Sequence, residues 1–361
     1  MGPAKNDIIT YVIHKIELTS SRIGFKFPHI TEGGCWKVTD EGSWTGGFWV
    51  GILWLAYILT KNEKFKKLAY KWMALLEPRK TDKMFDLGFL FYPSFVRGYK
   101  VTGDENLRKV ALEAANTLAG LYNTKSGFIC QEIKEGKFGR TAIDLIMDLP
   151  LLWWAYNESG EKNYYNVAYK HSVKSLKTLI KNDRPAIHAA DIDLNTGKIV
   201  RKLTLHGYSY NSRWSRGQAW CIYGFTLAYN ATKEKVFLSA AERLGGYFIK
   251  NLPVDHVPYW DLDDPNIPHA VKDTSAAGIA CSGLLTLSKL SGKDKFEKVA
   301  NKILNSLLTS YIADEGWSGI LKGGCFDRPK NLGVGESLIW GDYYFLESLM
   351  KSIRVLQPLD F

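Results

Sequence analysis

The chain has 361 residues, 46% of them hydrophobic, so it can bury a large core and is not expected to be disordered. It carries 47 Lys and Arg against 37 Asp and Glu, a formal net charge of +10, but these basic residues are scattered and form no arm or RNA-binding motif, which argues against nucleic acid as a partner. Trp, Tyr and Phe make up 13% of the chain, and aromatic side chains beside polar groups are one way in which proteins bind flat, amphipathic ligands.

The N-terminal residues contain no apolar segment of the signal-peptide type, and no stretch approaches the ~18 consecutive apolar residues of a membrane span. The five cysteines are far apart, odd in number and form no CxxC, so neither a disulfide framework nor a zinc site is indicated. We therefore expect a cytoplasmic protein, a monomer or homodimer, that uses no metal or other cofactor and does not bind membranes.

Two kinds of helical segment alternate along the chain. Six have the pattern of an amphipathic helix with one solvent-exposed face, since apolar residues recur at i, i+3, i+4 and i+7 with charges between them. The first covers about residues 6–18, and the others begin near Phe65, Leu107, Tyr164, Phe237 and Phe296. The six segments between and after them carry few charges and are apolar on most sides, as buried helices are: 48–59, 87–99, 143–156, 219–229, 276–290 and 338–350.

This strict alternation predicts an all-α fold, the (α/α)6 barrel, in which six buried helices form an inner ring and six amphipathic ones surround it. An open solenoid of helical hairpins is the alternative. No Pro-, Gly- or Ser-rich linker divides the chain, so we expect residues 1–361 to form a single catalytic domain. Pro150 is expected to kink or break the third inner helix.

The longest connections lead from outer to inner helices, over residues 126–141, 183–213, 253–272 and 313–335. Loops of this length are usually functional. All of them arrive at the N-terminal ends of inner helices, so the sequence predicts a site on that face of the barrel.

Polar residues, several of them carboxylates, open the inner helices. Capping is the simpler explanation for Ser43, Asp273 and Glu336. Asp86 and Asp144 stand among apolar neighbours, where partial burial raises a carboxyl pKa, and two carboxylates facing one cavity can perform acid/base catalysis. Asp148, one turn beyond Asp144, is expected to be a buried hydrogen-bond acceptor rather than a catalytic group.

Further polar and aromatic residues gather before and within the fourth inner helix. His188 and His206 lie in the connection that leads to it, and Trp214, Arg216 and Trp220 follow. Trp offers a flat stacking surface, and Arg offers a fork that binds carboxylates. No metal-binding spacing, GxSxG motif or phosphate-binding loop accompanies them.

From about Ser43 to Glu347, the chain resembles the unsaturated glucuronyl hydrolases, glycoside hydrolase family 88. Seven motifs occur in the family's order: Ser43-Trp-Thr-Gly-Gly-Phe-Trp49, Asp86-Leu-Gly-Phe89, Ile143-Asp-Leu-Ile-Met-Asp-Leu-Pro-Leu-Leu152, Trp214-Ser-Arg-Gly-Gln-Ala-Trp220 with Ile222-Tyr-Gly-Phe225, Pro258-Tyr-Trp-Asp261, Asp273-Thr-Ser-Ala276 and Ile339-Trp-Gly-Asp-Tyr-Tyr344.

The resemblance implies an (α/α)6 barrel that removes the 4,5-unsaturated uronic acid left by polysaccharide lyases at the non-reducing end of glycosaminoglycan fragments. A carboxylic acid protonates C4 of the double bond, water adds at C5, and the resulting hemiketal opens and releases the neighbouring sugar. Asp144 matches the family's general acid/base and Asp86 its second functional carboxylate. The matching substrate-binding residues are Trp44, His188, Trp214, Arg216 and Trp220.

The chain also departs from the family pattern. Phe85 and His206 stand where relatives often have His and Gln, and we place both in the substrate site. Arg213 and Lys322 could pair with a sulfate or be solvated loop cations. Two alternatives remain open: an unsaturated galacturonyl (rhamnogalacturonyl-type) hydrolase on the same fold, and a non-enzymatic helical scaffold that binds acidic glycans. The expected partner is an acidic unsaturated di- or oligosaccharide.

Overall fold

The computed structural model describes residues 5–134, 136–180 and 186–357 of the chain. The amphipathic segments form the outer helices, each with one face buried: α1 (Lys5–Arg22), α3 (Glu63–Leu76), α6 (Glu105–Gly120), α8 (Lys162–Thr178), α10 (Lys235–Lys250) and α12 (Asp294–Ser310). In α12, for example, Phe296, Ala300, Ile303, Leu304 and Leu307 face the interior, while the intervening charges face solvent.

The apolar segments form the inner helices. Four of them are α2 (Gly46–Thr60), α9 (Ser215–Thr232), α11 (Thr274–Ser291) and α13 (Ile339–Ser352). The second inner segment is a continuous helical run in three parts: α4 (Leu87–Phe91), a π-helical turn (Tyr92–Val96) and α5 (Arg97–Thr102). The third consists of a 3₁₀ turn (Ile143–Met147) followed by α7 (Leu149–Ser159). The third inner helix is therefore broken near Pro150, as expected: the 3₁₀ turn ends at Met147 and α7 begins at Leu149. Pro150 itself lies in the first turn of α7, where its missing N–H has no intrahelical partner to lose.

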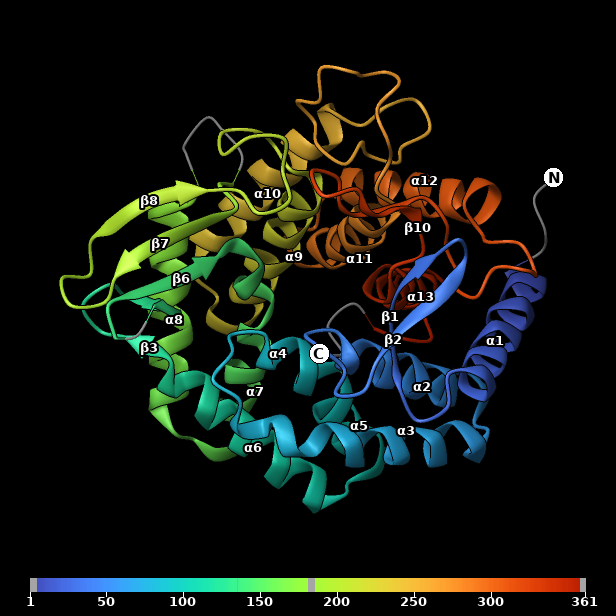
Figure 1. The fold of residues 1–361 in the computed structure, drawn as a ribbon, viewed down its shortest axis with the longest axis horizontal. Coiled ribbons are helices and arrows are strands. Elements are labelled where there is room, and N and C mark those ends of the chain that lie inside the picture. Colours follow the sequence, from blue (N-terminus) through green and yellow to red (C-terminus); the bar gives the residue numbers. More distant parts are fainter. Residues whose placement is uncertain (1–4, 135, 181–185, 358–361) are drawn as a thin grey trace.

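The inner helices close into a ring. Around it, α2 packs against α4, α4 against α7, α7 against α9, α9 against α11, α11 against α13, and α13 again against α2. Figure 1 shows the outer helices surrounding this ring. The closed ring confirms the predicted helical barrel and excludes the open solenoid.

The connections contain short strands that the helical prediction did not include. Two hairpins, β1 (Phe27–Glu32) with β2 (Cys35–Thr39) and β9 (Gly324–Asp327) with β10 (Leu332–Glu336), lie against each other at one end of the ring. A four-stranded antiparallel sheet joins β5 (Gln131–Lys134), β6 (Phe138–Ala142), β7 (Ala189–Asp193) and β8 (Ile199–Leu203). A small hairpin pairs β3 (Tyr122–Asn123) with β4 (Phe128–Ile129), and a 3₁₀ turn (Glu77–Thr81) follows α3. The first three residues of the expected 183–213 connection lie outside the described part of the chain.

The expected caps are confirmed in one case of three. Asp273 caps α11 by accepting the N–H groups of Ser275 and Ala276. Ser43 is not a cap, since Thr45 occupies the N-cap position of α2. Glu336 instead accepts from the Thr31 hydroxyl at 2.6 Å and from the Gly33 N–H at 2.9 Å, so it holds the β1–β2 turn.

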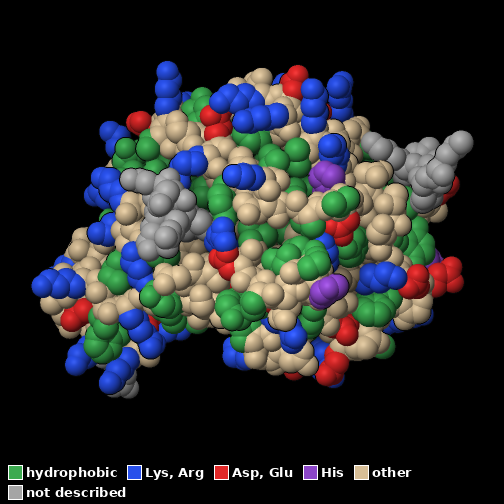
Figure 2. Space-filling model, turned by 90° about the horizontal axis from the view of Figure 1, so that it is seen from above, with side chains coloured by type: hydrophobic (Ala, Val, Ile, Leu, Met, Phe, Trp, Pro, Cys, Tyr) green, Lys and Arg blue, Asp and Glu red, His purple; other side chains and the backbone are tan. Residues whose placement is uncertain are grey.

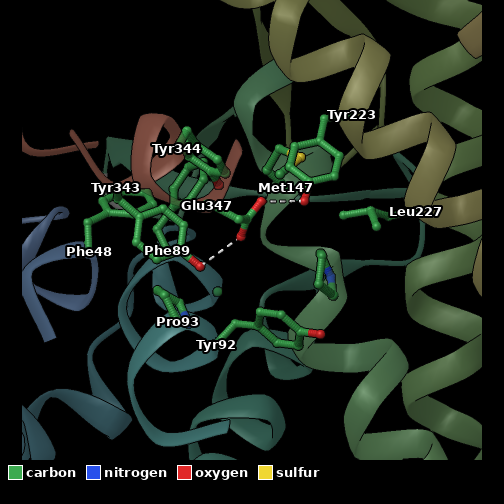
Figure 3. A pocket seen from close by; sticks show the side chains of 12 residues that line it. Phe48, Phe89, Tyr92, Pro93, Met147, Tyr223, Leu227, Tyr343, Tyr344 and Glu347 are labelled. Carbon is green, nitrogen blue, oxygen red and sulfur yellow. Dashed lines mark hydrogen bonds between the residues drawn. The ribbon is translucent and has the colours of Figure 1, made fainter. Parts of the chain in front are cut away.

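One cluster of buried hydrophobic residues extends from Ile8 to Leu356. We propose on this ground that residues 1–361 form one domain. Within the ring this core leaves a cavity of about 20 Å³, which is enough for a single water, and half of the residues that line it are aromatic (Figure 3).

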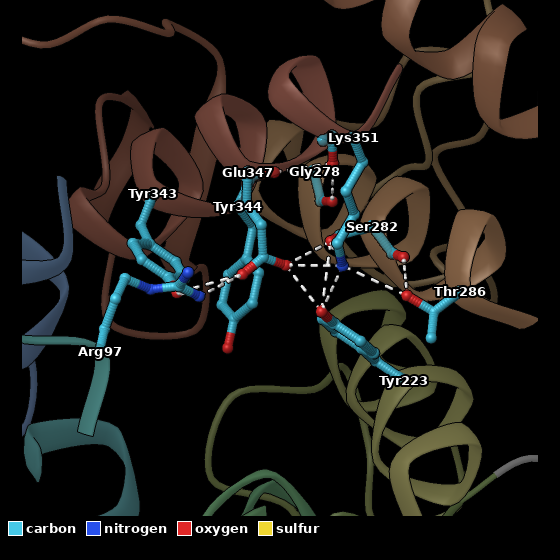
Figure 4. Close-up of polar contacts among 10 residues, drawn as sticks. Arg97, Tyr223, Gly278, Ser282, Thr286, Tyr343, Tyr344, Glu347 and Lys351 are labelled. Carbon is cyan, nitrogen blue, oxygen red and sulfur yellow. Dashed lines mark hydrogen bonds and ion pairs between the residues drawn. The ribbon is translucent and has the colours of Figure 1, made fainter. Parts of the chain in front are cut away.

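A buried ionic network lies beside this cavity (Figure 4). Glu347 of α13 accepts from the Tyr223 hydroxyl at 2.7 Å and from the Lys351 ammonium at 3.1 Å through one oxygen. Its other oxygen accepts from the Tyr343 hydroxyl at 3.1 Å and lies 3.5 Å from the Arg97 guanidinium. One carboxylate thus neutralises two buried cations and joins α5, α9 and α13.

On the surface shown in Figure 2, basic side chains are interspersed with hydrophobic, acidic and uncharged ones and form no continuous stripe. Among the described helices, none combines the length and apolarity needed to cross a membrane.

Candidate active site

Polar and aromatic side chains collect where the inner helices begin. Asp86 precedes the first residue of α4, and Asp144 lies in the 3₁₀ turn that leads to α7. Trp214 precedes α9, Trp340 is the second residue of α13, and Trp44 comes two residues before α2. This is the face that the long connections predicted.

The pairing of β6 with β7 brings Asp144 and His188 together. Ala142 pairs with Ala189, and the Ile143 N–H donates to the His188 carbonyl at 2.8 Å, so the next residue, Asp144, lies beside the histidine ring. His188 Nε2 is 3.7 Å from Asp144 Oδ2. The Leu205 N–H donates to His188 Nδ1 at 3.2 Å, which places the proton of the neutral ring on Nε2, facing the carboxylate.

This pair has unused hydrogen-bonding capacity. Among the described residues, neither His188 Nε2 nor Asp144 Oδ1 has a hydrogen-bond partner, although both atoms are buried. The Asp144 side chain keeps 21% of its surface exposed, so it is open on one side. The 3.7 Å separation is longer than a hydrogen bond, so the two groups interact electrostatically and each keeps a position for a further partner.

The pKa of Asp86 is strongly raised. Burial, followed by the negative charge of Asp144, raises the Asp86 pKa to about 8, and the Arg79 guanidinium opposes this shift. Its side chain makes no capping hydrogen bond to α4, although it occupies the N-cap position. The two interacting carboxyls therefore hold a proton at neutral pH, which suits acid/base chemistry.

Aromatic rings form a continuous wall along the site. His188 stacks on Trp214 with ring centroids 4.2 Å apart, and His206 lies 5.4 Å from Trp214 and 5.1 Å from Phe326. Phe326 is 5.4 Å from Trp340, which is 4.8 Å from Trp44. His206 Nδ1 also lies 3.1 Å from a carboxylate oxygen of the buried Asp327.

Three members of this wall were not identified from the sequence: His29, Phe326 and Trp340. Trp340 could have been found, because it opens an inner helix as Trp44 and Trp214 do. Phe326 lies in β9, within the 313–335 connection, which contains none of the seven family motifs. His29 comes from β1, where it contacts Trp44, Phe326 and Trp340, and no motif points to it.

Arg216 is in the site, but its guanidinium is committed to protein groups. It is 2% exposed, donates to Asp273 and to the Cys325 carbonyl at 2.6 Å, and donates to the Phe326 carbonyl at 2.7 Å. It therefore holds β9 against α9 and α11. Its expected contact with a substrate carboxylate stays a prediction.

Replacing Arg216 with lysine tests this structural role. A single ammonium cannot reach all three acceptors, so we expect the free energy of unfolding to fall by about 1–3 kcal/mol, measured by urea titration. Arg201→Lys is the control, because Arg201 is mostly exposed and Asp191 keeps its bond to Arg140. If the variant instead has a higher KM and the stability of the wild type, Arg216 binds substrate and has no structural role.

The other predicted residues occupy different depths. Trp220 is 1% exposed and packs beneath the site against Phe89, while Phe85 is half-buried next to Asp86. Arg213 is paired with Asp263, and Lys322 lies 3.1 Å from Asp314. A sulfate would compete with these carboxylates for either cation.

The described residues contain no group of three or more His, Cys, Asp or Glu side chains that could hold a metal ion.

The family model for Glycosyl Hydrolase Family 88 matches residues 26–350. The chain belongs to glycosyl hydrolase family 88. This membership confirms the family and the glycosidase class expected from the motifs.

Relatives agree over nearly the full length. The chain is 34% identical to an unsaturated chondroitin disaccharide hydrolase of Streptococcus pneumoniae over 95% of this chain and 90% of that protein. The crystal structure of the unsaturated glucuronyl hydrolase of Bacillus sp. GL1 superimposes with a TM-score of 0.93 at 31% identity, covering 97% of both chains. A Streptococcus agalactiae unsaturated glucuronyl hydrolase mutant, complexed with dGlcA-GalNAc6S, gives a TM-score of 0.85 at 30% identity, covering 98% of this chain and 93% of that one.

Proposed function

We propose that the chain removes the 4,5-unsaturated uronic acid from the non-reducing end of lyase-generated glycosaminoglycan oligosaccharides. The observation that carries this proposal is the interacting pair Asp86 and Asp144, which holds a proton beside the aromatic wall. The names of the relatives support the same substrate class, because they are hydrolases of unsaturated glucuronyl or chondroitin saccharides.

In the proposed reaction, Asp144 delivers to C4 of the substrate the proton that the carboxyl pair holds, water adds at C5, and the proton that this water loses returns to Asp144. The hemiketal then opens the ring and releases the neighbouring sugar. His188 directs its Nε2–H toward Asp144 and stabilises the carboxylate once the proton has left, and the raised pKa of Asp86 keeps one proton within the pair at neutral pH. The usual rule that relates carboxylate separation to retention or inversion does not apply, because the attack is not at the anomeric carbon.

The wall of the site suits the ligand. A planar unsaturated ring can stack on the partly exposed Trp44, and the net charge of +10 favours an acidic sugar. The functional partner is thus an acidic oligosaccharide, and its linkage and sulfation are the open variables.

A panel of unsaturated disaccharides tests the function directly. The conjugated C4=C5 bond absorbs in the ultraviolet, so turnover appears as loss of absorbance. We expect consumption of unsaturated glucuronyl disaccharides with N-acetylated hexosamine partners. Faster consumption of unsaturated galacturonyl-rhamnose ends would establish the rhamnogalacturonyl-type alternative, and binding of all panel members without turnover would establish the scaffold alternative.

The pH profile tests the proton of the carboxyl pair. Because the Asp86 pKa is raised to about 8, the pair keeps its proton below that pH and loses it as the pH rises through about 8. We expect kcat/KM to fall above pH 8 for two reasons. The pair then has no proton to give to the substrate, and its second negative charge repels the uronate. The residual rate of Asp86→Asn should lack this alkaline limb, and a wild-type profile that stays flat from pH 7 to about 9 would contradict the assignment.

A further inference from the structure

Asp148 makes the hydrogen bond that a residue at the position of Asp86 normally makes. Asp86 occupies the N-cap position of α4, where an aspartate side chain usually accepts the N–H of the second or third helical residue. Asp104 and Asp273 do this for α6 and α11. In α4, the third N–H, that of Phe89, donates instead to Asp148 Oδ1 at 2.8 Å, across 59 residues of chain.

The contact between the two segments is tight. Asp148 is completely buried, at 0% exposure. A Cβ atom on Gly88 would lie 2.2 Å from the Asp148 Cα, so only glycine permits this approach. Asp148 therefore contacts the beginning of α4 twice: its backbone packs against Gly88, and its side chain accepts the Phe89 N–H.

We propose that Asp148 is a positioning residue for the reaction: it caps α4 from the neighbouring segment and so leaves the Asp86 carboxyl free to face Asp144. The inference rests on the proposed function, since it assigns Asp86 and Asp144 to the chemistry. It explains why the family-like Ile-Asp-Leu-Ile-Met-Asp segment carries two aspartates one turn apart. The first meets the substrate, and the second fixes the opposing carboxyl.

The protonation state of Asp148 allows a clean test. Burial and the nearby charge of Asp86 raise the Asp148 pKa well above its ordinary value, and the Phe89 N–H opposes this. The titratable groups that face it are Asp86, Asp144 and the Tyr344 hydroxyl of α13. A neutral carboxyl accepts through its carbonyl oxygen, which asparagine reproduces, so Asp148→Asn preserves the cap without a new charge.

The experiment compares Asp148→Asn with Asp148→Ala by steady-state kinetics on an unsaturated disaccharide and by amide hydrogen exchange over residues 87–91. We expect Asp148→Ala to lose roughly 10- to 100-fold in kcat per folded molecule, with KM almost unchanged and faster exchange at Phe89. Asp148→Asn should keep kcat within about threefold and retain both exchange protection and the wild-type pH profile. Asp104→Ala, which removes the cap of an outer helix, should leave kcat unchanged.

Equal kcat in wild type and Asp148→Ala would overturn the proposal, and so would equal losses in the Ala and Asn variants, because the amide can still cap. If Asp148→Ala does not fold, Asp148→Val, which leaves a smaller cavity and has no acceptor, takes its place. An inactive wild type would refute the proposed function instead, and the exchange measurement, which needs no turnover, would still decide whether Asp148 caps α4.

Discussion

Asp144→Asn is expected to lower kcat on an unsaturated disaccharide by about 10²- to 10⁴-fold, the usual contribution of a general acid. An amide has no proton to deliver to C4, whereas its size and hydrogen-bonding atoms fit the same place beside His188. Loss of ultraviolet absorbance measures the rate, and circular dichroism verifies that the variant is folded.

The control for Asp144 is Asp193→Asn. Asp193 accepts the N–H groups of Asn195 and Thr196 in the turn after β7, a role that asparagine can also fill, and it lies outside the site. Its kcat should equal that of the wild type. If Asp144→Asn consumes the disaccharide as fast as the wild type does, Asp144 is not the acid.

The second large effect concerns stability. Glu347→Ala is expected to lower the free energy of unfolding by about 3–5 kcal/mol, because it leaves the buried Arg97 and Lys351 without their shared carboxylate. Urea titration followed by tryptophan fluorescence measures the change. Glu63→Ala, which removes an exposed pair with Lys66 and an exposed hydrogen bond from the Tyr57 hydroxyl, should lower the free energy of unfolding by less than about 1 kcal/mol.

The pH dependence of this effect has a defined sign. Lys351 and Arg97, opposing the burial penalty, lower the Glu347 pKa from 4.5 to about 2. A carboxyl whose pKa is lower in the folded state stabilises that state at every pH above its pKa in the unfolded chain. This stabilisation is lost as the pH falls toward the pKa in the folded state. The stability difference between wild type and Glu347→Ala should therefore be constant near neutrality and shrink between about pH 4.5 and 2. A difference that grows on acidification would contradict the ion-pair explanation.

The helical framework was predictable because each ring of helices has its own burial pattern. The charged face of α12 and the nearly uncharged length of α11, which has Lys289 alone in its last turn, differ in the sequence itself. The strands were not predictable in the same way. β5 is four residues long, largely exposed and partly charged, and its pairing depends on a partner strand rather than on its own residues.

Which residues form the site was predictable from the sequence, but which of them contact one another was not. Asp86 and Asp144 stood out as carboxylates in apolar surroundings, and both lie where expected. The approach of His188 to Asp144 depends on the register of β6 and β7, which no local pattern encodes. The partner of Arg216 was missed for the same reason, since Asp273 is 57 residues away along the chain.

The claim that this enzyme hydrates the C4=C5 bond is tested most directly by an unsaturated disaccharide analogue in which a methylene group replaces the glycosidic oxygen. Hydration does not need that oxygen, so the wild type should abolish the absorbance of the analogue without releasing the second sugar, and Asp144→Asn should not. An analogue that stays intact while the natural disaccharide is consumed would show that the enzyme cleaves the glycosidic bond directly, and would contradict the mechanism proposed for Asp144.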